Sequence, residues 1–233
     1  MGYILVDNAR HVKRAFECLR DVVHEVTFCR EKGLAVRAAN AGVRVEALFL
    51  RPLEYEKGVT CGVSTDTMAR LLRTASNDQK VRIEITEKEV RFEMFTEQRV
   101  TRFLVPTIDS AFLPGFDVLE PRAVVVLKTE HMRSLLRDLR YAGDRMAIEL
   151  RHGALLLQGK ADNAHGEVVT KEVRVDGKDD YYGVYSAGVM RHFLKSQHVS
   201  NTLSICLYDS RMRLVVEADI RLTLELDELG GCL

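Results

Sequence analysis

The sequence lacks the cysteine arrangements that hold a disulfide framework or a zinc ion. Its five cysteines are scattered, odd in number and without CxxC spacing, which favours reduced and mostly buried thiols in an intracellular protein. The seven histidines also lack the spacing of metal ligands. We therefore predict no metal site and no other cofactor.

Long apolar runs are missing as well. No run approaches the roughly 18 residues that cross a membrane. The first residues, MGYILVD, have neither the basic region nor the apolar core of a secretory signal. Val6 stands where a myristoylated Gly2 requires Ser or Thr. We expect no contact with a membrane.

No catalytic motif is present. The chain contains no GxGxxG, P-loop, GxSxG or HExxH pattern. The acidic pair in Asp179-Asp180-Tyr181-Tyr182 is typical of a surface loop and does not indicate paired catalytic carboxylates. We therefore predict a protein that is not an enzyme and has no catalytic residue.

An excess of either charge is also absent, since 34 basic and 34 acidic residues give a formal charge of zero. This balance argues against a protein that binds nucleic acid by being basic throughout, and it leaves room for a local basic patch. Apolar residues make up 46% and charged residues 29%. Such a chain can form one large domain or two domains of about 110 residues each.

The stretch RHVKRAFECLRDVV, from Arg10 to Val23, predicts an amphipathic helix. At about 100° per residue, Val12, Phe16 and Leu19 share one side, while basic and acidic residues share the opposite side. For a single helix, a solvated polar face explains this pattern. Three further stretches, 64–75, 130–141 and 187–196, carry basic residues opposite an apolar stripe in the same way.

Alternating and β-branched residues predict short strands between these helices. They lie at 3–6, within 24–50 with turns near Lys32-Gly33 and Ala41-Gly42, and at 80–85, 89–95, 99–108 and 123–128. A polar, loop-like stretch at 53–62 interrupts them, although 59–63 also fits a strand.

The second half repeats the first. Leu136-Arg137-Asp138 follows Leu19-Arg20-Asp21 by 117 residues, and a hairpin turning at Gly153 follows one turning at Gly33 by 120. The last helix matches the second at an offset of 121. We predict two copies of a βαβββαβββ-like unit in an α+β protein, each with a curved antiparallel sheet and two helices on its inner face.

Charge is sorted between the elements. The four helical stretches carry a net charge of +6, so the remaining chain carries −6. Helices tolerate Arg and Lys better than strands do, which explains part of this bias. It does not explain why the basic residues of all four helices lie on the side away from the apolar stripe. Such a basic surface would meet the regularly spaced phosphates of a nucleic acid without reading its bases. The residues on that side are Lys13, Arg14, Arg20, Arg70, Arg73, Arg137, Arg140, Arg191 and Lys195.

Residues 109–121, DSAFLPGFDVLEP, break the alternation with two prolines and a glycine and predict a linker. The predicted domains are therefore 1–108 and 122–233, joined by this segment. Its five large apolar residues exceed what an idle linker requires, although ordinary packing would also explain them.

Four segments resemble the sliding-clamp family of proliferating cell nuclear antigen (PCNA). They are LVDNARHVKRAFECLRD, GVSTDTMARLLRTASNDQKVRIEI, LLRDLRYAGDRMAIELRHGALLLQGKAD and VYSAGVMRHFLKSQHVSNTLSICLYDSRMRLVVEADI. The resemblance implies a non-catalytic homotrimeric ring with helices lining the hole. Such a ring encircles duplex DNA without sequence preference and serves a DNA polymerase, a clamp loader and replication or repair proteins, in the nucleus if the source is eukaryotic.

The resemblance also assigns roles to residues. The family's inner basic positions fall on Lys13, Arg14, Arg20, Arg70, Arg73, Arg137 and Lys195, with Arg140, Tyr141 and Arg191 beside them. The subunit edges fall at 100–105 and 166–173. The interdomain connector falls on Asp109–Pro121 and covers a pocket for PCNA-interacting peptide motifs. The candidates for that pocket are Val43, Leu113, Phe116, Val118, Leu224 and Leu226.

The chain departs from the family at three places. Ala39 and Asn40 replace a methionine and an acidic residue, and the tail DELGGCL lacks the usual proline. A subunit of a heterotrimeric checkpoint or repair clamp, acting as a signalling platform, remains the alternative, and a non-ring structural protein is a third hypothesis.

Overall fold

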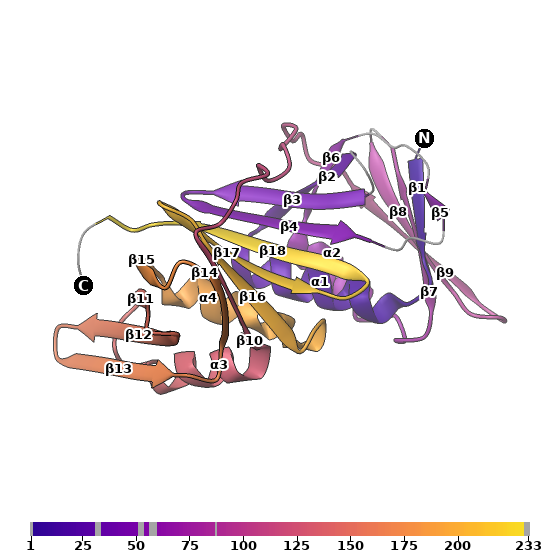
Figure 1. The fold of residues 1–233 in the computed structure, drawn as a ribbon. Helices are drawn as coiled ribbons and strands as arrows, with labels where there is room; N and C mark the ends of the chain where they lie inside the picture. Colours follow the sequence, from indigo (N-terminus) through magenta and orange to yellow (C-terminus); the bar gives the residue numbers. More distant parts are fainter. Residues whose placement is uncertain (1, 31–33, 51–53, 56–59, 87, 231–233) are drawn as a thin grey trace. The chain divides into compact units, whose positions relative to one another are not determined.

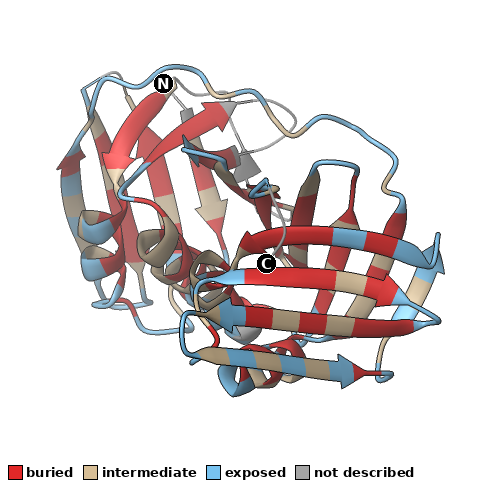
Figure 2. Cartoon of the chain, turned by 90° about the vertical axis from the view of Figure 1, so that its left-hand side faces the viewer, coloured by how far each residue is buried: buried red, intermediate tan, exposed pale blue. Residues whose placement is uncertain are grey.

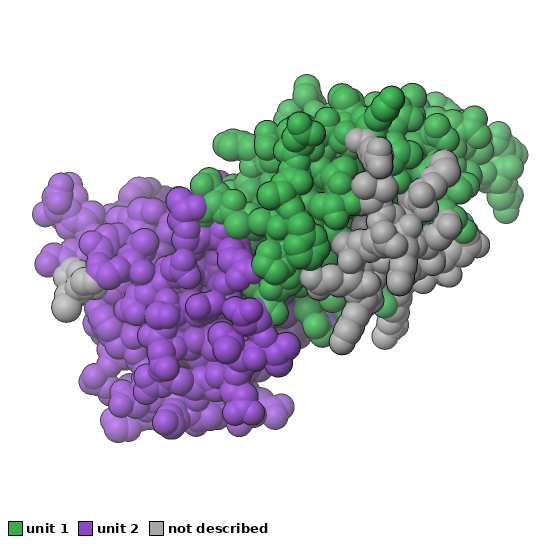
Figure 3. Space-filling model, turned by 90° about the horizontal axis from the view of Figure 1, so that it is seen from above, with its two compact units in different colours: residues 1–40, 45–116, 218–222 green, residues 41–44, 117–217, 223–233 purple. Residues whose placement is uncertain are grey.

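The computed structural model describes residues 2–30, 34–50, 54–55, 60–86 and 88–230. The chain divides into two compact units, which Figure 3 colours separately. Unit 1 contains residues 1–40, 45–116 and 218–222, and unit 2 contains residues 41–44, 117–217 and 223–233. Each unit therefore includes a short segment from the other half of the sequence.

Unit 1 contains two antiparallel groups of strands (Figure 1). The first has the order β5-β1-β7-β8-β9 and the second the order β4-β3-β2-β6. The bounds of the first group are β1 Gly2–Val6, β5 Glu54–Tyr55, β7 Lys80–Ile85, β8 Glu89–Phe95 and β9 Val100–Pro106; those of the second are β2 Glu25–Arg30, β3 Leu34–Asn40, β4 Val43–Phe49 and β6 Cys61–Ser64.

Helices α1 (Ala9–Val22) and α2 (Thr65–Leu72) begin at side-chain caps. The Asn8 side chain accepts a hydrogen bond from the Arg10 amide at 2.8 Å, and Ser64 accepts one from the Thr67 amide at 3.4 Å. On α1 the buried Phe16 ring meets Phe28 of β2 at 6.2 Å between ring centroids. This contact places the apolar side of α1 against the sheet, as the sequence pattern predicts.

Unit 2 repeats this arrangement. Its strand groups have the orders β14-β10-β16-β17-β18 and β13-β12-β11-β15, so within these groups every strand has the neighbours of the strand nine places earlier. The predicted duplication and α+β class are confirmed by this match. The bounds are β10 Ala123–Lys128, β11 Arg145–Arg151, β12 Ala154–Ala161, β13 Ala164–Thr170, β14 Arg174–Gly177, β15 Asp180–Ser186, β16 Thr202–Leu207, β17 Arg211–Glu217 and β18 Ile220–Asp227.

The helices of unit 2 are shorter than the sequence predicts. Helix α3 spans Thr129–Asp138 and ends before the predicted boundary at Tyr141, and α4 (Ala187–Phe193) passes into a 3-10 turn at Leu194–His198. Met132, Leu136, Met190 and Phe193 of these helices are buried. Figure 2 shows the resulting division of helices into buried and exposed sides.

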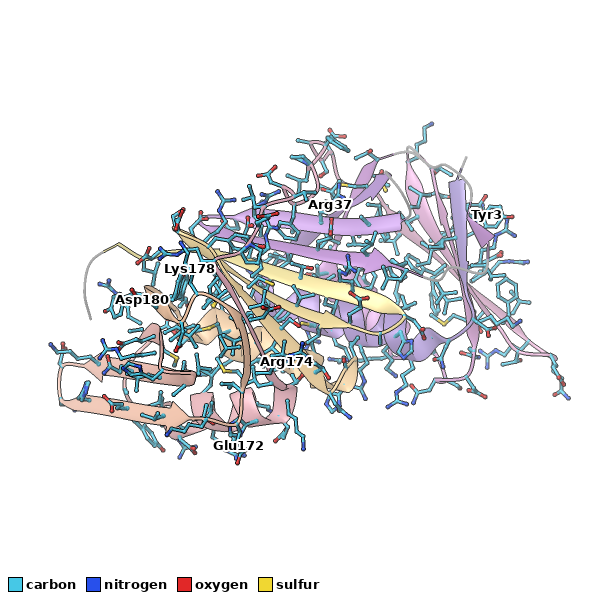
Figure 4. The ribbon with its side chains drawn as sticks, viewed as in Figure 1. Tyr3, Arg37, Glu172, Arg174, Lys178 and Asp180 are labelled. Carbon is cyan, nitrogen blue, oxygen red and sulfur yellow. The ribbon has the colours of Figure 1, made fainter. Side chains whose placement is uncertain are left out.

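The prediction of a loop at Asp179-Asp180-Tyr181-Tyr182 is wrong. Strand β15 begins at Asp180, which Figure 4 labels, and its tyrosines alternate between buried and exposed positions as a strand requires. The hydroxyls of Tyr181 and Tyr185 contact each other over Gly183, and burial raises the pKa of both. The sequence also missed β5, a two-residue strand paired with β1. The predicted turn at Lys32-Gly33 lies outside the described residues.

The five-stranded group of unit 1 has an ion-paired surface. Arg91 contacts Glu84 at 3.2 Å and Arg102 contacts Glu93 at 2.7 Å across neighbouring strands. The Arg82 guanidinium lies 4.4 Å from the ring centre of Tyr3, which is also labelled in Figure 4. Charged residues therefore complete the polar side of strands whose other side supplies the core.

We predict that the protein loses stability in alkali through Cys61. Burial, with a smaller contribution from Cys29, raises the pKa of the Cys61 thiol from 9.0 to about 11. The folded pKa lies above the unfolded value, so this contribution is fully present below pH 9 and is lost as the pH rises through about 11. A shift of this size corresponds to about 2–3 kcal/mol.

Urea denaturation across this pH range measures the effect, with Cys61→Ala as the comparison. The difference in unfolding free energy between the two proteins is expected to shrink as the pH rises. A difference that stays constant across the range would contradict the assignment.

Candidate nucleic-acid and partner interfaces

Helices α1 and α2 bring basic side chains of unit 1 together. The Lys13 Nζ of α1 donates to the backbone carbonyl of Arg73, at the end of α2, at 3.4 Å. Arg70 and Arg73 are exposed, and Lys13, Arg14 and Arg20 are partly exposed. All five predicted DNA-contacting residues of this half therefore project from one pair of adjacent helices rather than from the core.

Carboxylates on the same helices hold several of these cations. Arg14 contacts Glu17 at 2.7 Å, Arg20 contacts Asp21 at 3.3 Å and Arg70 contacts Asp66 at 3.0 Å. Such pairs are worth little in water, because solvent screens partly exposed charges. They orient the guanidinium groups at the helix surface.

Unit 2 places four predicted residues on its helices or directly after them, with Arg140 beyond the end of α3. Arg137 and Arg140 are exposed, and the Arg140 guanidinium lies 4.3 Å from the ring centre of Tyr141, which is 72% exposed. Lys195 is exposed in the 3-10 turn that follows α4. Arg191 differs from these three, because it is partly buried and donates to the carbonyl of Gly143 at 3.3 Å.

These two helix surfaces present exposed or partly exposed Arg and Lys side chains. Arg and Lys on helix sides reach phosphate oxygens, which carry no base sequence. Within the described residues, no group of three or more His, Cys, Asp and Glu side chains is arranged to hold a metal ion. No helix in the described ranges is long and apolar enough to cross a membrane.

The start of the connector, with Ile108 just before it, lies directly on β6 in unit 1. Ile108 and Gly62 exchange two backbone hydrogen bonds, of 2.8 and 3.1 Å. A Cβ atom at Gly62 would lie 2.8 Å from the Cβ of Ser110, which is closer than real contacts allow. Glycine is therefore required for this approach.

The connector covers the face of β2 and β3 opposite α1. Thr27 and Arg37 are register partners and so share a face, on which the Thr27 hydroxyl contacts that of Ser110. Cys29, also on this face, donates to the Leu113 carbonyl at 3.5 Å. Because a helix covers one side and the connector the other, β2 is buried on both faces from Val26 to Cys29.

The predicted partner-binding residues differ in exposure. Leu113, Phe116 and Val43 are partly exposed, and Val118 is fully exposed. Leu224 and Leu226 are 0% and 2% exposed in the core of unit 2, where a partner would reach them only by displacing their neighbours. The sequence did not single out Phe112 and Leu119, which are exposed in the same connector.

The predicted subunit edges are edge strands in their own units. Strand β9 ends the five-stranded group of unit 1 and leaves Val100 and Leu104 exposed. Strand β13 ends the four-stranded group of unit 2 and leaves Val169 exposed. Edge strands present unpaired backbone groups to which another strand can add.

Residues 4–105 match the family model of the proliferating cell nuclear antigen N-terminal domain. The crystal structure of the proliferating cellular nuclear antigen from Entamoeba histolytica is similar along nearly the whole chain. Its TM-score is 0.87 at 16% sequence identity, over 98% of this chain and 99% of that one.

In fold, the chain is a PCNA-like clamp. The predicted clamp fold is thereby confirmed. Within this PCNA-like chain, sequence reasoning did not single out Gly62, which the connector approaches, or Arg37 and Arg213, which each donate to a connector carbonyl. A glycine inside β6 and an arginine inside each of the strands LAVRAAN and RMRLVVE were the available signals.

Proposed function

We propose that the protein is a DNA sliding clamp, a polymerase processivity factor that encircles duplex DNA. The observation that carries this proposal is the pair of basic, outward-facing helices in each half of a PCNA-like fold. A phosphate-contacting lining retains DNA of any sequence, and a neutral chain with a local basic surface favours sliding over tight binding. This role requires no catalytic residue, metal or cofactor.

The proposed lining consists of Lys13, Arg14, Arg20, Arg70, Arg73, Arg137, Arg140, Arg191 and Lys195. Residues 1–108 and 122–233 form the two clamp domains, joined by the connector at 109–121. Within the connector, Leu113, Phe116 and Val118 bind partner proteins that carry PCNA-interacting peptide motifs, among them a polymerase and a clamp loader. In a eukaryotic host the protein acts in the nucleus, in DNA replication and repair.

A ring of three chains follows if β9 of one subunit pairs with β13 of the next. Such a head-to-tail contact closes when the rotation between subunits completes a circle. The exposed apolar residues on both edge strands support this pairing, since they would be buried by strand addition.

We predict that the purified chain forms a homotrimer at micromolar concentration. Size-exclusion chromatography with light scattering is expected to give three times the 26.4 kDa chain mass. Leu104→Lys on β9 should shift the population toward monomer, because it places a charge in the strand contact. A wild-type monomer would instead favour a subunit of a heterotrimeric checkpoint or repair clamp.

The lining is tested by Arg14→Ala combined with Arg73→Ala. We expect several-fold shorter products from the cognate polymerase on primed circular DNA, because two phosphate contacts per subunit are lost, while the trimer persists. The charge-matched control is Arg151→Ala with Arg174→Ala, two exposed arginines on strands of unit 2. Equal product lengths for both double variants would refute the assigned lining.

The connector is tested by Leu113→Ala combined with Phe116→Ala. A peptide with the glutamine, aliphatic and paired aromatic residues of the PCNA-interacting motif should bind the wild type and lose most of its affinity for this variant. Isothermal titration calorimetry measures both affinities. Arg122→Ala, an exposed change after the connector, serves as the control. Retained affinity in the double variant would place the peptide site elsewhere.

A further inference from the structure

A buried arginine of unit 1 joins a strand pair to the connector. Arg37 of β3 donates from Nε to Glu46 of β4 at 2.5 Å, and both side chains are about nine-tenths buried. Its Nη1 donates to the backbone carbonyl of Leu113 at 3.0 Å. Figure 4 labels Arg37 on β3. One guanidinium group therefore holds a strand carboxylate and a connector carbonyl at the same time.

Unit 2 contains the same arrangement at a different pair of strands. Arg213 of β17 donates from Nε to Glu225 of β18 at 2.6 Å, and its Nη1 donates to the carbonyl of Asp117 at 2.8 Å. Both side chains of this ion pair are more than nine-tenths buried. The Tyr208 ring lies 4.9 Å from the Arg213 guanidinium and covers it.

The duplication provides an internal comparison for the first arginine. In the repeated topology β12 and β13 correspond to β3 and β4. Gln158 and Glu167, each 121 residues after Arg37 and Glu46, are register partners there and share an exposed hydrogen bond of 2.8 Å. The glutamate is kept in this copy, whereas the arginine is replaced by a shorter neutral donor.

Cross-strand pairing alone therefore does not require the arginine. Burying an ion pair costs desolvation energy, and apolar residues at such positions are often as stable. The feature common to Arg37 and Arg213 is a second hydrogen bond, to a carbonyl of the connector. Arginine suits this arrangement because its planar guanidinium group presents several N–H donors at fixed angles. A hydrogen bond to the strand carboxylate therefore points a second donor toward the connector carbonyl.

We propose that Arg37 and Arg213 are positioning residues for the partner-binding connector. Each fixes one connector carbonyl within its own unit, that of Leu113 in unit 1 or that of Asp117 in unit 2. The connector backbone at each anchor is thereby ordered before a peptide binds. Binding then requires less ordering of the connector, which raises affinity without a new contact to the peptide. This inference rests on the proposed role of the connector.

The experiment compares Arg213→Lys with Arg211→Lys. Lysine keeps the charge beside Glu225 but cannot hold two acceptors in the fixed geometry of a guanidinium group. Arg211 is the matched control, because it lies on the same strand and contacts the same Glu225, at 3.6 Å. Two measurements are made on each protein: the rate of chymotrypsin cleavage within 109–121, with cut sites read by mass spectrometry, and calorimetric affinity for the motif peptide.

Arg213→Lys is expected to cleave about tenfold faster in the connector and to bind the peptide about tenfold more weakly, as for loss of one hydrogen bond to a charged group. Arg211→Lys should match the wild type in both. If Arg213→Lys does not fold, by its thermal unfolding curve, the same measurements on Arg37→Lys decide the proposal.

The cleavage rate separates this inference from the proposed function. An unchanged cleavage rate in the lysine variant overturns the positioning role, whatever the peptide does. If the lysine variant is cleaved faster but the wild type binds no motif peptide, the arginine does anchor the connector. The proposed peptide partner of the connector is then overturned. Faster cleavage with unchanged affinity shows that the anchors do not serve binding, and it also overturns the positioning role.

Discussion

Burial of one side of each helix against an antiparallel sheet is the constraint on which the rest of the structure depends. Once Phe16 packs on Phe28, the remaining sides of α1 are set by helical geometry. Its basic residues then have to face solvent, because burying them without partners is costly. Helices α2, α3 and α4 also bury one side. The packing that forms the core therefore also leaves their basic side chains on the outward sides of the helices.

The sequence predicts elements that have a clear period and misses those set by distant contacts. The bounds of β7, β8 and β10 agree with the alternation of their residues. Strand β15 was mistaken for a loop because two acidic residues outweighed the alternation of the tyrosines behind them. Arg37 and Arg213 donate hydrogen bonds to carbonyls 76 and 96 residues away, which local patterns do not reveal.

In unit 1, the sheet separates two surfaces with different chemistry. Helix α1 covers the face of β2 that bears Phe28, and the connector covers the face that bears Thr27 and Cys29. The basic helices and the apolar connector therefore lie on opposite sides of one layer of strands. Because the layer of strands separates them, a ligand on one of these surfaces would not compete with a ligand on the other.

The exchange of short segments between the two units affects how far the halves are independent. Residues 218–222 complete unit 1, where the Asp219 carbonyl accepts from the Leu50 amide and its carboxylate contacts His11 at 2.9 Å. Residues 41–44 complete unit 2, where the Gly42 carbonyl accepts from the Asp227 amide. Neither half of the sequence therefore supplies a whole unit. A chain split at the connector would give two fragments that each lack a short segment of the unit they otherwise form.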